Sequence, residues 1–85
     1  MKINKLTLAY MDGCPHCLTA QLALKKYGVT YEKLNWSLDS NDAIFEELGI
    51  SKVPVLLFPS EDGSKRLEGE DAIKDYAMKL KEGLI

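Results

Sequence analysis

The run from Val53 to Phe58 constrains the fold more than any other segment of the chain. It reads Val-Pro-Val-Leu-Leu-Phe and is almost wholly apolar. A strand that lacks a polar face is typically buried on both sides, as the central strands of α/β sheets are. We therefore predict a central strand over 53–58, in a sheet that carries helices on both faces.

The segment before this strand begins with a strand pattern and continues as a helix. A short strand is expected over 6–11, where Asp12-Gly13 ends it. Pro15 fits the first helical turn, because its missing N–H has no partner to lose there, and Gly28 is a good helix stop. The apolar stripe of this helix is expected to contain Leu18, Leu22, Ala23 and Tyr27.

Strand and helix patterns alternate through the rest of the chain. A strand is expected over 30–36, and a short helix ends at Gly49 before the central strand. Asp62-Gly63 predicts a turn into a partner strand around 65–67, and the last helix begins at about Glu70. The order β-α-β-α-β-β-α predicts one α/β domain over residues 1–85, a four-stranded mixed sheet flanked by three helices.

Charge and hydropathy exclude some functional classes. The 85 residues include 11 Lys and Arg and 13 Asp and Glu, with a net charge of −2 and no basic cluster of the kind that binds nucleic acid. No stretch approaches the roughly 18 apolar residues of a membrane span, and the N-terminus lacks a secretory pattern. We expect a soluble, cytoplasmic protein, although a mature periplasmic protein would have the same composition.

The two cysteines stand together as Cys14-Pro15-His16-Cys17. A disulfide that closes so small a loop adds little stability, so redox chemistry explains the pair better than a structural role. Cys14 lies where a strand gives way to a helix, and the helix N-terminus favours its thiolate, the attacking form. Cys17 is one turn further on and more buried, which suits a resolving thiol. We predict that Cys14 and Cys17 perform the chemistry, with Pro15 starting the helix.

His16 has two readings. A protonated imidazole beside Cys14 would favour its thiolate and make the disulfide more oxidising, whereas a solvated ring would do neither. A zinc site is not expected, because His16 is the only histidine and no second cysteine pair exists to complete four ligands. Trp36 and Phe58 are expected in the core.

Three segments together resemble the glutaredoxins, members of the thioredoxin-like superfamily, and the resemblance covers nearly the whole chain. They are Tyr10 through Cys17, with His16 where the family usually has Tyr, then Val53-Pro54, and then Gly69-Glu70-Asp71. The resemblance implies a thioredoxin-like fold with a cis Pro54 beside the dithiol. It also implies that the Val53 backbone pairs with a bound peptide or glutathione. The start of the last helix, Gly69 to Asp71, would receive glutathione.

The sequence also departs from the family pattern around this site. Glu68 replaces a glycine of the family and Glu70 adds a further negative charge, while Lys52 restores some positive charge. An anionic tripeptide would therefore meet a less favourable field than in typical glutaredoxins.

Tyr10 ends the first strand and is expected either to line the substrate groove or to pack.

The resemblance implies dithiol–disulfide exchange on proteins or glutathione mixed disulfides, in electron transport and cell redox homeostasis. We expect a monomer without a bound cofactor or metal. Its substrates would be proteins that contain disulfides, with ribonucleotide reductase as one candidate. Glutathione as a cosubstrate or a flavoprotein thioredoxin reductase would supply the electrons. The alternative is a thioredoxin-like binding module or metal carrier that uses the cysteines without turnover.

Overall fold

A four-stranded mixed sheet forms the middle layer of the structure, a computed structural model that describes residues 1–84. The strands lie in the order β2-β1-β3-β4, with β1 parallel to β2 and antiparallel to β3, which is antiparallel to β4. Their bounds are Thr7–Tyr10 for β1, Glu32–Asn35 for β2, Val55–Leu57 for β3 and Arg66–Glu68 for β4.

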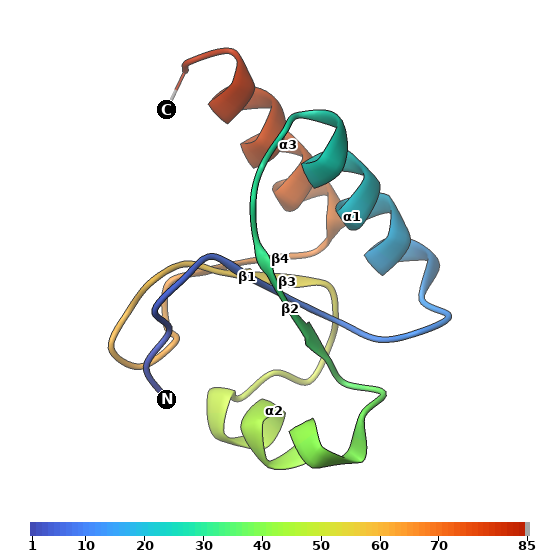
Figure 1. Ribbon diagram of the computed structural model, residues 1–85, viewed down its shortest axis with the longest axis vertical. Coiled ribbons are helices and arrows are strands. Elements are labelled where there is room, and N and C mark those ends of the chain that lie inside the picture. Colours follow the sequence, from blue (N-terminus) through green and yellow to red (C-terminus); the bar gives the residue numbers. More distant parts are fainter. Residues whose placement is uncertain (85) are drawn as a thin grey trace.

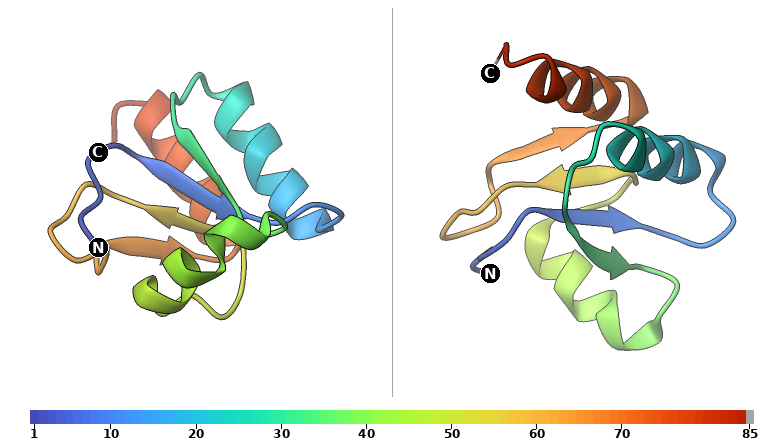
Figure 2. Two further views of the ribbon diagram at one scale, coloured as in Figure 1. Left: turned by 60° about the horizontal axis from the view of Figure 1, so that its bottom comes forward. Right: turned by 45° about the horizontal axis from the view of Figure 1, so that its top comes forward.

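Helices cover both faces of this sheet (Figures 1 and 2). Helices α1 (Pro15–Lys26) and α3 (Glu70–Lys81) lie side by side on one face. Helix α2 (Asp42–Leu48) covers the other face and follows a single 3₁₀ turn, η1 (Asp39–Asn41). The predicted element order and the α/β class are confirmed.

Alternation along the central strands produces a core on each side of the sheet, because successive strand side chains point to opposite faces. Leu8 and Leu56 point towards α1 and α3, whereas Val55 and Leu57 point towards α2. All three residues of β3 are buried, as the prediction of a doubly covered strand requires. The first core also contains Ala20, Leu24, Ile73 and Ala77, and the second contains Ile3, Ala9, Phe45, Leu48 and Ile50.

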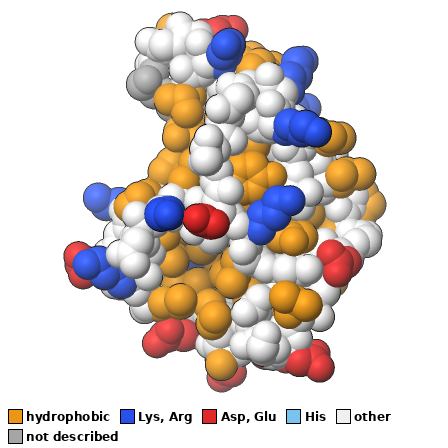
Figure 3. Space-filling model, in the orientation of Figure 1, with side chains coloured by type: hydrophobic (Ala, Val, Ile, Leu, Met, Phe, Trp, Pro, Cys, Tyr) orange, Lys and Arg blue, Asp and Glu red, His pale blue; other side chains and the backbone are white. Residues whose placement is uncertain are grey.

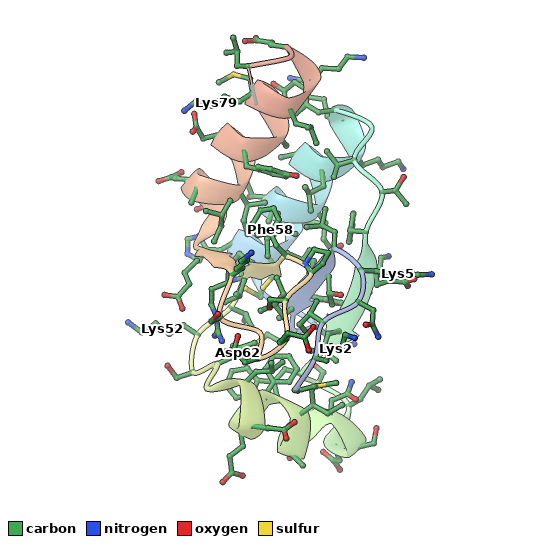
Figure 4. All side chains as sticks on the ribbon, turned by 90° about the vertical axis from the view of Figure 1, so that its left-hand side faces the viewer. Lys2, Lys5, Lys52, Phe58, Asp62 and Lys79 are labelled. Carbon is green, nitrogen blue, oxygen red and sulfur yellow. The ribbon has the colours of Figure 1, made fainter. Side chains whose placement is uncertain are left out.

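The aromatic residues expected in the core do pack there. Trp36 stacks on Phe45 with ring centroids 4.9 Å apart, beneath α2. Phe58 meets Tyr76 edge to face at 5.1 Å and lies between the sheet and α3 (Figure 4).

Two sequence predictions are wrong in detail. Strands β1, β2 and β3 are shorter than expected, and β3 begins only at Val55 because Pro54 has no N–H to donate to a ladder. On α1, Leu18 and Leu22 are 56% and 57% exposed rather than buried. Ala23 of the expected stripe is buried and Tyr27 packs against the core, and the rest of the buried face of α1 consists of Cys17, Ala20 and Leu24.

Candidate functional site

Strand ends bring the predicted site residues to one end of the sheet. Ala9 of β1 is paired with Val55 at the start of β3, and Val55 is paired with Glu68 at the end of β4. The segments that continue from these three positions therefore meet. They are the loop and helix start that carry the cysteines, the Val53-Pro54 segment and the first turn of α3.

Cys14 is the N-cap residue of α1, and Pro15 is at its first turn. The Cys17 backbone N–H donates a hydrogen bond to Cys14 Sγ at 3.2 Å, and the Leu18 N–H donates to the Cys14 carbonyl at 3.0 Å. N–H groups at a helix start stabilise negative charge placed on them. The Cys14 sulfur is half-buried and a free thiol, so it can accept a substrate at the surface.

Cys17 is a free thiol with different surroundings, and its side chain is only 1% exposed. Burial raises the pKa of the Cys17 thiol from 9.0 to about 11, and its hydrogen bond with the Cys14 side chain and the charge there act in the same direction. A backbone hydrogen bond with Met11 acts against them. Cys17 is therefore a protonated thiol near neutral pH, which suits a second, resolving step.

The loop that carries Cys14 is held against the end of β2. The Asp12 N–H donates to Ser37 Oγ at 2.8 Å, and Asn35 Nδ2 donates to Asp12 Oδ1 at 3.3 Å. Beside it, the Trp36 N–H donates to the Tyr10 carbonyl at 2.7 Å. These bonds fix where α1 begins, and no local sequence pattern predicts them because the partners are far apart along the chain.

A cleft of about 510 Å³ lies between the Val53-Pro54 segment and α3. The Val53–Pro54 bond is cis, as the resemblance implied, and the Gly69 N–H donates to the Pro54 carbonyl at 3.0 Å. Six of the predicted substrate-binding residues line the cleft together with His16: Lys52, Val53, Pro54, Gly69, Glu70 and Asp71. The side chain of Lys52 extends outward from the molecule (Figure 4).

Tyr10, the remaining predicted substrate-binding residue, lies in a separate pocket of about 400 Å³ that also contains Cys14, Pro15 and Cys17. The exposed side chains of Met11 and Leu18 form part of its wall. Tyr10 is only partly buried and packs against the core under α1 and α3. It therefore both packs and faces the dithiol.

His16 makes a contact that the sequence did not predict. Its Nδ1 lies 2.6 Å from Glu70 Oε1, so the ring bridges the first turns of α1 and α3. The hydrogen bond from His16 lowers the pKa of Glu70, with the charge of His16 and of Lys74 acting in the same direction. Glu70 was expected as a cleft residue, but the 54 positions between the partners hide their contact.

Neither a metal centre nor a membrane-spanning helix is found within residues 1–84. No group of three or more His, Cys, Asp and Glu side chains in this part of the chain is arranged to hold a metal ion. None of its helices is both long and apolar enough to cross a bilayer.

Comparison with solved structures identifies the architecture. A Tau class glutathione S-transferase from mango, Mangifera indica, superposes with a TM-score of 0.67 at 22% sequence identity. The match covers 93% of this chain and 35% of the transferase chain. The chain has a thioredoxin-like fold. No protein-family model matches it, and no curated protein sequence matches it significantly.

Proposed function

We propose that this thioredoxin-like chain is a thiol–disulfide oxidoreductase of the glutaredoxin type, with Cys14 as nucleophile and Cys17 as resolving thiol. One observation carries the proposal. The N-cap sulfur of Cys14 is accessible and accepts the Cys17 N–H, while the Cys17 thiol is buried one helical turn behind it. This asymmetry matches the two unequal roles that dithiol exchange requires.

In the first step, the Cys14 thiolate attacks one sulfur of a substrate disulfide. A bond forms between Cys14 and that sulfur, and the other substrate sulfur leaves as a thiolate that takes a proton from solvent. The protein and the substrate are then joined by a mixed disulfide. The pocket that holds Tyr10, Met11 and Leu18 around the dithiol gives the substrate an apolar surface to rest on.

In the second step, Cys17 loses its proton and attacks Cys14. The Cys14–Cys17 disulfide forms, and the second substrate sulfur is released as a thiolate. The high pKa of the Cys17 thiol depends partly on the Cys14 side chain. Once Cys14 sulfur is bonded to substrate it carries no charge, so that contribution is removed and Cys17 loses its proton more easily. In the resting protein, the Cys17 thiol therefore stays protonated until the mixed disulfide at Cys14 has formed.

The cleft beside the dithiol is the proposed binding site for the extended substrate chain. The backbone of Val53 and the start of α3 at Gly69 flank it. Three carboxylates line it, those of Glu68, Glu70 and Asp71, against the single lysine Lys52. This balance disfavours an anionic tripeptide and favours a neutral or basic peptide segment.

Two electrons must return to the protein after each cycle. Two glutathione molecules or a flavoprotein thioredoxin reductase would supply them. One structural neighbour is a glutathione S-transferase, which keeps glutathione a candidate, but the negative lining of the cleft favours the reductase. We propose a cytoplasmic, monomeric reductant of protein disulfides, with ribonucleotide reductase among the candidate substrates and no bound cofactor.

Two cysteine variants test the proposal. Cys17→Ser should accumulate a covalent mixed disulfide with a disulfide-containing substrate such as insulin, because the resolving thiol is gone. Cys14→Ser should lose turnover entirely and trap nothing. Mass spectrometry under non-reducing conditions detects the mixed disulfide in each variant. The double variant, which lacks both thiols, gives the background signal.

Two results would contradict the proposal. Trapping through Cys17 in Cys14→Ser would reverse the roles of the two thiols. Metal that co-purifies with a protein inactive on every disulfide would favour the alternative, a binding module or metal carrier.

A further inference from the structure

The contact between His16 and Glu70 joins the cysteine motif to the last helix. The Nδ1 and Oε1 atoms are 2.6 Å apart, and the His16 side chain is 68% exposed while that of Glu70 is 27% exposed. Thr19 and Lys74 also act on Glu70, and the Glu70 pKa is lowered overall, so its carboxylate is charged at neutral pH. The ring is thus held against a negative charge.

This pairing changes what His16 can do for Cys14. With Glu70 ionised, His16 Nδ1 carries the proton that it donates, whether the ring is neutral or cationic. Any positive charge on the ring is then matched by a carboxylate at hydrogen-bond distance. The field that Cys14 receives from the first turn of α1 is therefore weaker than that of an unpaired imidazolium.

We propose that Glu70 is a positioning residue for the dithiol: it fixes the His16 ring and offsets its charge, and so sets the balance between the Cys14–Cys17 dithiol and disulfide. This inference rests on the proposed redox function and assigns to α3 a part in tuning it. Glu70 acts through His16 and needs no contact with the substrate.

The inference predicts opposite effects for the two partners. Glu70→Gln removes a negative charge and leaves the ring unopposed, which favours the Cys14 thiolate and therefore the dithiol. His16→Gln leaves the Glu70 carboxylate without its partner, and the extra negative charge favours the disulfide. A purely structural contact would give both variants shifts of the same sign, or none.

The test is the equilibrium of each protein with a glutathione redox buffer at neutral pH. The Cys14–Cys17 disulfide and two glutathione thiols exchange for the dithiol and one glutathione disulfide, and alkylation followed by mass spectrometry counts the two forms. We expect the equilibrium constant to move about threefold towards dithiol in Glu70→Gln and about threefold towards disulfide in His16→Gln, the scale of one exposed ion pair. High salt should reduce both shifts.

A matched control is Glu82→Gln, which changes the net charge equally at the far end of α3. Glu82 is about 18 Å from Glu70 along the helix, at 1.5 Å per residue. The dithiol–disulfide equilibrium of the Glu82→Gln variant should therefore equal that of the wild type. Shifts of the same sign for Glu70→Gln and His16→Gln, or no shift for either, would overturn the inference while leaving the redox function intact. Failure of the wild type to form a Cys14–Cys17 disulfide in any buffer would instead overturn the proposed function, and this inference with it.

Discussion

Cys14 and Cys17 are the same amino acid three positions apart, yet the fold gives them different surroundings. Cys14 ends a loop at the helix start, while Cys17 faces the sheet on the buried side of α1. Their difference in exposure could be predicted from the sequence, because helix geometry places the N-cap residue outside the first turn and residue N3 within it. The His16–Glu70 pair could not, because no local pattern links residues on two different helices.

Burial of Cys17 predicts a loss of stability at alkaline pH. The folded-state pKa of this thiol is about 11, above its ordinary 9.0, so the fold favours the protonated form. The resulting stability is complete below pH 9 and is lost as pH rises from about 9 to about 11. At about 1.4 kcal/mol per pKa unit, the free energy of unfolding of the reduced protein should fall by on the order of 2 kcal/mol across this window.

The measurement is urea unfolding of reduced protein at several pH values, with Cys17→Ala as the control. Tyr31, whose pKa burial also raises, titrates in both proteins, so the difference between them isolates Cys17. Parallel pH profiles for the two proteins would show that the thiol titrates normally in the folded state.

At the scale of elements, helix α1 shows what an apolar pattern does and does not determine. Its start at Pro15 follows from the motif, and the helix ends at Lys26, close to Gly28 as expected. Its buried face was predicted only in part: Ala23 is buried as expected, whereas Leu18 and Leu22 are exposed. Small side chains decide the matter: Ala20 and Ala23 let α1 lie close to the sheet and α3, and no periodicity count weights them above leucine.

Two leucines of α1 that are two positions apart therefore differ in their effect on stability. Leu24→Ala empties a fully buried site and should cost about 2–5 kcal/mol in the free energy of unfolding. Leu22→Ala removes the same atoms from a 57% exposed site and should change stability by less than about 0.5 kcal/mol. Chemical denaturation of both variants provides the comparison. Equal losses in the free energy of unfolding would mean that Leu22 is buried, as the sequence pattern predicted.

For the whole molecule, the sequence predicted the order of elements and the central strand, and these account for most of the fold. It did not show how charged side chains are placed on the surface: on the face drawn in Figure 3, acidic side chains lie at the α2 end and also elsewhere, and basic ones lie at the centre as well as towards α1 and α3. The candidate site was predictable from three motifs because strand register alone brings their ends together. The cleft lining between them depends on loop packing, which periodicity does not describe.

The opposite end of the sheet is closed by contacts that span the chain. Ile3 and Ser60 exchange backbone hydrogen bonds of 2.8 and 2.9 Å, and Arg66 donates to the Leu48 carbonyl at 2.6 Å and to the Gly63 carbonyl at 3.1 Å. Gly63 is buried at this junction, and a Cβ there would overlap the Leu48 side chain. One small residue thus lets the N-terminus, α2 and the β3–β4 connection meet.

Gly63→Ala should therefore destabilise the protein more than Gly28→Ala, its matched control. Both glycines have φ near +70°, at +75° and +72°, so each alanine incurs about 1–2 kcal/mol for a left-handed backbone. Only an alanine at position 63 would also overlap the Leu48 side chain, since the space around Gly28 is open. Overpacking of this kind typically costs a further ~1–3 kcal/mol in the free energy of unfolding. Urea unfolding measures the difference, and equal losses would contradict it. Because the junction and the dithiol lie at opposite ends of the sheet, the folded fraction of Gly63→Ala should keep the wild-type rate of the proposed disulfide exchange.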